Sequence, residues 1–167
     1  MDSKLKSCLE NLGVQYIEHE HPPVFTVEES KILKKDILGL HTKSLFLKDD
    51  KGDFYLVCMS ADKRLDIKGL RKYLKTEKLH FASPEELKSH LNLTPGSVSI
   101  FGMINSEDDS VTLILEKEVW SSERVNFHPN INTSTLELSH EDISIFYNSL
   151  DCRKKILNLE NLEEDAE

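Results

Sequence analysis

The sequence has little cysteine and no long apolar segment. Its three cysteines, Cys8, Cys58 and Cys152, are widely spaced in 167 residues and form no C-x-x-C pair. An odd number at such spacing argues against a disulfide framework and a zinc ribbon, and fits a reducing compartment. No apolar run approaches the ~20 residues that a membrane span needs. The N-terminal residues also lack the apolar core of a secretory signal, so we expect a cytoplasmic protein with no membrane partner.

Several catalytic motifs are absent as well. The chain has no G-x-S-x-G elbow, no P-loop and no G-x-G-x-x-G, so a serine or cysteine nucleophile gains no local support. His19 and His21 would share one face of a strand. No third residue completes a ligand set at recognisable spacing. We therefore expect no metal site and no cofactor.

The charge of the chain is unevenly distributed. The formal net charge is −9, which at first sight argues against a nucleic-acid partner. Residues 160–167 carry five acids and no base, and without them the net charge is −4. Residues 61–78 carry seven bases and three acids. This basic stretch is either a solvated helix face or a landing surface for an anionic partner.

The length and hydropathy pattern predict one α+β domain. The 38% hydrophobic content suits a single core over residues 1–158, and we expect the acidic tail, residues 159–167, to be disordered. Capping signals predict helices that start near residues 5, 26, 66, 83 and 139, with Gly13 and Gly39 ending the first two. Alternation and apolar runs predict strands at residues 14–18, 44–48, 54–59, 78–80, 97–100, 111–115, 125–127 and 133–137. The mixed order indicates a mixed sheet with helices packed on it.

Three features could carry chemistry. Lys43 stands at the start of an apolar strand, where its side chain either reaches water or faces a cleft. In a cleft its ammonium suits a phosphate or carbonyl oxygen. The turn at residues 94–98 contains Gly96 and could aim backbone N–H groups at an oxygen. His128 precedes Pro129, which fixes the chain there, although a histidine hydrogen-bonded at a turn would be the simpler interpretation.

Six motifs in order resemble one known family. They are residues 21–29 (HPPVFTVEE), 41–49 (HTKSLFLKD), 62–66 (DKRLD), 81–87 (FASPEEL), 95–102 (PGSVSIFG) and 127–129 (FHP), with Asn132-Thr133 just after. The chain thereby resembles the YbaK/ProX superfamily of trans-acting aminoacyl-tRNA editing domains from about Leu5 to Leu150. It is most similar to the ProX/PrdX branch of free-standing Ala-tRNA(Pro) deacylases. The resemblance implies an α+β fold with a mixed, partly barrel-like sheet surrounded by helices.

The resemblance also implies an activity, partners and a site. The activity is hydrolysis of mischarged Ala-tRNA(Pro) by water, because prolyl-tRNA synthetase cannot reject the smaller alanine by size alone. The partners are the acceptor end of a mischarged tRNA and, as a second candidate, prolyl-tRNA synthetase; no DNA partner is expected. The family's essential lysine maps onto Lys43, and its histidine onto His128. The implied catalytic set is Lys43, Gly96, Ser97 and His128, and the implied substrate-binding set is Phe25, Thr26, Ser44, Leu45, Val98 and Ile100.

For the acceptor stem we expect contacts from the basic stretch, at Lys63, Arg64, Lys68, Arg71, Lys72 and Lys75. Two positions depart from the family pattern. Ser44 stands where the branch usually has asparagine, and Ile100 stands where the glycine loop usually ends in proline. Two alternatives therefore stay open: a deacylase for another mischarged tRNA such as Cys-tRNA(Pro), and a tRNA-binding or regulatory module without turnover.

Overall fold

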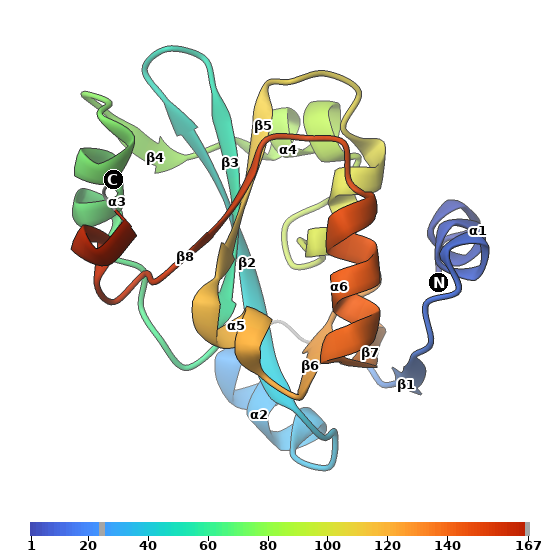
Figure 1. Ribbon diagram of the computed structural model, residues 1–167. Coiled ribbons are helices and arrows are strands. Elements are labelled where there is room, and N and C mark those ends of the chain that lie inside the picture. Colours follow the sequence, from blue (N-terminus) through green and yellow to red (C-terminus); the bar gives the residue numbers. More distant parts are fainter. Residues whose placement is uncertain (24–25, 166–167) are drawn as a thin grey trace.

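The computed structural model describes residues 1–23 and 26–165 and shows an α+β protein built on one mixed sheet. Its strands are β1 (Ile17–Glu20), β2 (Leu40–Asp49), β3 (Phe54–Ser60), β4 (Leu79–Phe81), β5 (Val111–Glu116), β6 (Arg124–Phe127), β7 (Ser134–Ser139) and β8 (Lys154–Leu157). Its helices are α1 (Ser3–Leu12), α2 (Val27–Lys34), α3 (Ile67–Leu74), α4 (Pro84–Leu91), α5 (Lys117–Ser121) and α6 (His140–Ser149), with 3-10 helices η1 (Ile100–Asn105) and η2 (Leu162–Asp165). Figure 1 shows α3 to one side of the β2–β3 hairpin and α6 and α1 to the other. The predicted fold class is confirmed.

Most helix ends follow the capping signals in the sequence. Gly13 ends α1 in the left-handed conformation, with φ 73°. Ser83 and Glu86 form the capping box at the start of α4, and the side chains of Asp66 and Ser139 cap α3 and α6. The side-chain caps satisfy backbone N–H groups that the first helical turn leaves without a partner, and the Gly13 amide satisfies carbonyls of the last turn of α1.

Gly39 does not end α2 as expected. The helix stops at Lys34, and Gly39 lies in the link to β2 with φ 100°. A Cβ at this position would lie 2.8 Å from the carbonyl carbon of Arg124. Gly39 is therefore required by a close approach of two backbones and not by the end of the helix.

The strand predictions hold with one clear error. The β2–β3 hairpin and the fully buried β5 lie where the sequence places them. The strand expected at residues 97–100 is wrong, because the Ser99 hydroxyl accepts the Phe101 amide and starts η1. Strand β8 was not predicted, since its first residues are Lys154 and Lys155 and only Leu157 is buried.

Strand β2 joins the two halves of the sheet. The strand order is β1-β7-β6-β2-β3-β5-β8, with β4 also paired to β2. One edge of β2 pairs with β3 from Thr42 to Lys48. Its other edge pairs with β6 at Leu40 and His41 and with β4 from Leu47 onward. Between these two short ladders that edge of β2 stays open. Within the described residues the order ends at β1 and β8, so the sheet does not close into a full barrel.

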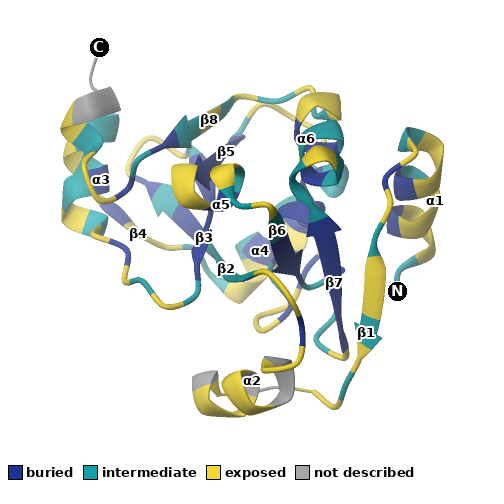
Figure 2. Cartoon of the chain, turned by 60° about the horizontal axis from the view of Figure 1, so that its bottom comes forward, coloured by how far each residue is buried: buried dark blue, intermediate teal, exposed yellow. Residues whose placement is uncertain are grey.

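The core forms two clusters on opposite faces of the sheet. Strand β3 shows the division, because Leu56 and Cys58 belong to one cluster and Tyr55, Val57 and Met59 to the other. The first cluster fills the space under α1, α4, η1 and α6, and the second lies under α3 and η2. Figure 2 shows that buried residues gather in the strands, whereas β1 and the described part of α2 are mostly exposed.

The acidic tail departs from the expected disorder over its described part, residues 159–165. Leu159 is buried in the second cluster, Leu162 packs against that cluster, and Glu160 pairs with Lys63. Figure 1 shows η2 beside α3, in agreement with the contacts between these elements. Two leucines spaced by three residues supply enough apolar surface to hold the chain there. The domain boundary at residue 158 stays a prediction.

Candidate functional site

The glycine loop, defined here as residues 94–98, lies where η1 approaches the sheet. The Ser97 amide donates to the Thr94 carbonyl at 3.1 Å, which closes a turn with Gly96 at φ 91°. Because this bond occupies it, the Ser97 amide does not serve as the predicted donor to a ligand. Within residues 1–23 and 26–165, the amides of Gly96 and Val98 have no hydrogen-bond partner. These two N–H groups are the donors that the loop can offer.

The open edge of β2 lies next to this loop. Successive residues of an antiparallel strand direct their N–H and C=O groups to opposite edges. The Ala61 amide donates to the His41 carbonyl on the β3 side, and the Ala82 amide donates to the Phe46 carbonyl on the β4 side. By this alternation, the N–H and C=O of Ser44 point to the open edge. That edge borders a hollow of about 220 Å³, lined by Ser44, Leu45, Phe46, Phe81, Ala82, Ser83, Pro84, Leu87, Pro95, Gly96 and Val98.

His128 stands at the start of the connection between β6 and β7. Its Nδ1 lies 3.1 Å from the Ser134 carbonyl, and its ring centroid lies 6.2 Å from that of His21. Asn132, in the same connection, lies 4.0 Å from where a Gly96 Cβ would stand. Asn130, at φ 65°, donates to the Phe101 carbonyl at 3.4 Å. The fold thus brings the β6–β7 connection and the glycine loop together.

Lys43 lies at the same level of β2 but on the opposite face from Ser44. The Ser44 hydroxyl donates to Cys58 Sγ at 3.3 Å, on the side of the first cluster. The Lys43 ammonium instead donates to the Lys63 carbonyl, on the side of the second cluster and α3. Lys43 is not among the residues that line the hollow, although Leu45, which shares its face of β2, is. Burial raises the pKa of Cys58 to about 12, against the opposing effect of the Ser44 hydrogen bond, so this thiol stays protonated at neutral pH.

Not every predicted substrate-binding residue reaches the hollow. Ser44, Leu45 and Val98 line it. Ile100 is fully buried in the first cluster, so its prediction as a lining residue is wrong. Thr26 is exposed, and its hydroxyl accepts the Glu29 amide as the cap of α2. Phe25 lies outside the described residues.

The cations of the basic stretch differ in their exposure and in their partners. Arg64, Lys68, Lys72 and Lys75 are exposed, and Arg71 donates to the Thr76 carbonyl at 3.4 Å.

Lys63 differs, because its ammonium pairs with Glu116, Glu118 and Glu160. The hydrogen bond to Glu118, together with those to Glu160 and Glu116, raises the pKa of Lys63 in spite of desolvation. Its ammonium is thus already engaged by three carboxylates, and its role as a phosphate contact stays a prediction.

Two neighbours of the site were not predicted. Phe81 lines the hollow although its side chain is 57% exposed, and Asn132 faces Gly96. A sequence signal existed for each, since both lie in or directly after a family motif. The sequence could not show that strand β4 ends beside the glycine loop, because that follows from the pairing of β2 with β4.

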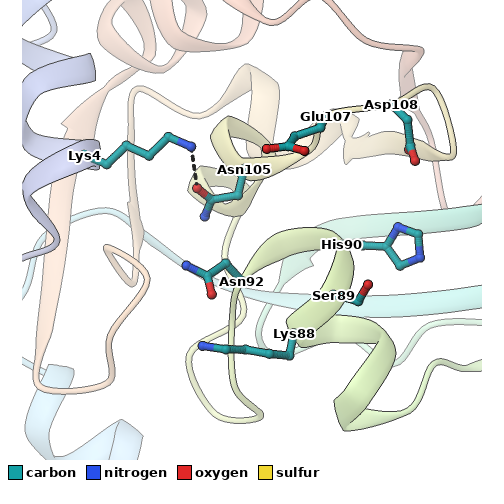
Figure 3. Close-up of a pocket in the computed structure, with 8 residues that line it drawn as sticks. All are labelled: Lys4, Lys88, Ser89, His90, Asn92, Asn105, Glu107 and Asp108. Atoms are coloured by element: carbon teal, nitrogen blue, oxygen red, sulfur yellow. Dashed lines mark hydrogen bonds between the residues drawn. The ribbon is translucent and has the colours of Figure 1, made fainter.

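A second, more polar hollow of about 420 Å³ lies between α1, α4 and η1 (Figure 3). Its groups already contact one another: Lys4 donates to Asn105 Oδ1 at 2.9 Å, and Asn105 donates to the Leu91 carbonyl. His90 and Asp108 both contact Ser110. Both lysines and carboxylates line this hollow, so its charges favour neither an anionic nor a cationic ligand.

The relationship of the chain to known proteins agrees with this geometry. The fold class matches a solved structure, "Crystal structure of hypothetical protein APE2540", with a TM-score of 0.71 at 18% identity over 90% of this chain and 98% of that one. The model of the family "Aminoacyl-tRNA editing domain" matches residues 21–146, which include the glycine loop and His128. The chain belongs to the aminoacyl-tRNA editing domain family.

Two relatives indicate which branch of the family the chain resembles. "Prolyl-tRNA editing protein ProX" of Acetoanaerobium sticklandii is 38% identical over 86% of this chain and 89% of its own length. "Prolyl-tRNA synthetase associated domain-containing protein 1" of Mus musculus is 31% identical over 95% and 96%. The chain is therefore a ProX-like editing domain. None of its described helices has the length and apolar character needed to cross a bilayer.

A buried carboxylate holds together the strands that carry His128. Glu137 of β7 has a side chain only 4% exposed. Its two oxygens accept from Arg124 Nε at 2.8 Å and contact His19 Nε2 at 2.9 Å. Burial alone would raise the pKa of Glu137, but the hydrogen bonds from His19 and Arg124 outweigh it and lower the pKa. The ion pair therefore links β1, β6 and β7.

Replacing Arg124 should weaken this link in a pH-dependent way. Arg124→Met should destabilise the protein by about 1–3 kcal/mol at pH 7, because Glu137 is left charged and buried with one partner fewer. A lowered carboxyl pKa contributes stability above the unfolded value near 4.5 and loses it as the pH falls through the folded value. The difference between variant and wild type should thus shrink below about pH 4. Urea unfolding across pH 3–8 measures it, and a difference independent of pH would contradict this account.

Proposed function

We propose that the protein is a trans-editing deacylase that hydrolyses the ester of Ala-tRNA(Pro), with water as the nucleophile. The observation that carries the proposal is the pair of amides at Gly96 and Val98, which have no partner among the described residues and lie next to the open edge of β2. Two such donors can bind the ester carbonyl and the negative charge that develops on its oxygen in the transition state. The name of the Acetoanaerobium sticklandii relative, a prolyl-tRNA editing protein, supports tRNA(Pro) as the tRNA.

The reaction needs no nucleophile from the protein. Water adds to the ester carbonyl, the bond to the terminal ribose oxygen breaks, and free alanine and a tRNA with a free hydroxyl are released. The high pKa of Cys58 and its burial argue against a thiol nucleophile. Asn132 lies beside Gly96, and His128 belongs to the same connection, from which the two can orient the ribose or the attacking water.

The open edge of β2 and its face toward α3 suggest two separate roles. At the open edge, Ser44 and Val98 border the hollow of about 220 Å³, which can receive a small acyl group. On the face toward α3, the Lys43 ammonium lies on the side of the exposed cations of that helix. From there it can stabilise charge at the terminal phosphate or at the ester in the transition state.

A non-catalytic tRNA-binding module is the second candidate, favoured by Ile100 in place of the family's proline. Ile100 is the first residue of η1 and is fully buried. At the first position of a helix the backbone N–H has no helical partner, so proline and isoleucine are both tolerated there. The substitution therefore leaves the donors at Gly96 and Val98 in place, which supports the deacylase.

Deacylation assays test the proposal directly. Wild-type protein should release alanine from Ala-tRNA(Pro) and leave Pro-tRNA(Pro) intact, as selection by side-chain size requires. Lys43→Ala should reduce the rate by roughly 100-fold or more, as expected when an electrostatic contact to the substrate is lost. Lys51→Ala, in the exposed β2–β3 turn, is the matched control and should keep full activity.

The outcomes separate the candidates. Release of cysteine from Cys-tRNA(Pro) but not of alanine would move the substrate to another small amino acid. Binding of charged tRNA with no ester cleavage would identify a non-catalytic module. Unchanged activity in Lys43→Ala would remove that residue from the mechanism.

The glycine loop yields a paired prediction. Gly96 and Gly52 have similar φ values, 91° and 87°, and neither has an atom closer than 4.0 Å to an added Cβ. Gly96→Ala and Gly52→Ala should therefore each cost about 1–2 kcal/mol of stability through backbone strain. Only Gly96→Ala should also lower kcat, by roughly 10- to 100-fold, because it displaces the carbonyl-binding amides. Equal activities of the two variants would contradict the assigned role of the loop.

The exposed cations of α3 give a prediction about tRNA binding. The double variant Lys68→Glu/Lys72→Glu should weaken tRNA binding and lower its salt slope by roughly one unit per lost phosphate contact. Lys6→Glu/Lys51→Glu makes the same change of net charge on exposed residues elsewhere and should leave the slope unchanged. Filter binding between 50 and 200 mM salt, the usual range for such slopes, measures both. Identical slopes for the two variants would identify α3 as a solvated face.

A further inference from the structure

Lys63 joins three separate parts of the chain through its ammonium. It pairs with Glu116 at the end of β5, with Glu118 in α5 and with Glu160 in the tail. The Glu116 side chain is only 2% exposed. A carboxylate this deeply buried requires a charged partner. Lys63 is thus an internal counter-ion and not a free surface cation.

The same contacts fix the backbone between β3 and α3. Glu116 accepts the Ser60 amide at 2.8 Å with the oxygen that does not face Lys63. The Lys63 amide in turn donates to the Ser60 carbonyl at 3.3 Å. Both ends of the Ser60–Lys63 turn are therefore tied to one buried carboxylate.

This turn carries the acceptor that holds Lys43. The Lys43 ammonium donates to the Lys63 carbonyl, 20 residues further along the chain. The position of that carbonyl depends on the turn, which depends on the pairing of the Lys63 side chain with Glu116. A continuous path of contacts therefore runs from the tail and β5 to Lys43.

We infer that Lys63 is a positioning residue for Lys43, held in place by Glu116 and, from the tail, by Glu160. The inference rests on the role proposed above for Lys43. The Lys63 carbonyl fixes where the Lys43 ammonium meets the substrate, and the paired Lys63 side chain fixes that carbonyl. Displacement of a substrate-contacting group by about 1 Å can lower a rate by two orders of magnitude.

The test removes the ion pair without leaving a buried charge alone. Lys63→Met/Glu116→Gln should keep the fold, checked by thermal melting, because both charges are lost together. Its kcat for Ala-tRNA(Pro) should fall roughly 10- to 100-fold, while KM and the salt slope of tRNA binding stay at wild-type values. Lys63→Arg keeps the positive charge that pairs with Glu116 and should retain most of the kcat. Lys117→Met, an exposed lysine between the two glutamates, is the matched control.

A second measurement is independent of turnover. The rate at which a water-soluble succinimidyl ester acylates Lys43, read by peptide mass spectrometry, should rise about three- to tenfold in the double variant, as expected on loss of one hydrogen bond. Unchanged labelling of Lys43 would overturn the inference. A raised KM and a lower salt slope with normal kcat would overturn it too, and would make Lys63 a phosphate contact. If wild-type protein shows no deacylation, the proposed function fails, and the labelling still decides whether Lys63 positions Lys43.

Discussion

The site depends on the divided pairing of one strand. Strand β2 is bonded along one edge to β3, but its other edge is shared between β6 at one end and β4 at the other. A strand edge with unpaired N–H and C=O groups must meet another partner or water. Here the glycine loop covers the gap without forming a ladder with it. Its own unpartnered amides, at Gly96 and Val98, therefore lie next to the open edge of β2.

The period of two along β2 separates the chemistry of the site onto two faces. Ser44 and Phe46 belong to the face of the first cluster, and Lys43 to the face of α3. A substrate whose acyl group lies against the glycine loop and whose phosphates follow α3 would have to cross β2 near Ser44. An aminoacylated 3′ end has this form, since one ribose separates the ester from its phosphate. In the proposed reaction, Lys43 and the amides of the glycine loop would thus contact different parts of the substrate.

Local signals in the sequence predicted much of the fold, but they could not predict which side chains contact each other. Caps such as Ser83 and Gly13 act within one helical turn, so the pattern of neighbours was sufficient to find them. The roles of Lys63 and Ile100 depend on contacts with residues far along the chain. Charge alone placed Lys63 with the phosphate contacts, and only the fold brings Glu116 to it. Ile100 was expected at the pocket because of its position in a motif, but η1 turns its side chain into the core.

The acidic tail shows why charge is a poor guide both to the partner of a protein and to the order of a segment. Its acids contribute more than half of the −9 of the chain, which argued against an RNA partner, and its acidic composition at the end of the chain suggested disorder. Yet Leu159 anchors the described part of the tail, and Glu160 faces a cation that Glu116 and Glu118 already neutralise. Glu160 therefore contributes to an ion-pair cluster beside the turn that holds Lys43. The exposed lysines of α3, which have no such partners among the described residues, keep their positive charge available to an anionic ligand on the same face of the sheet.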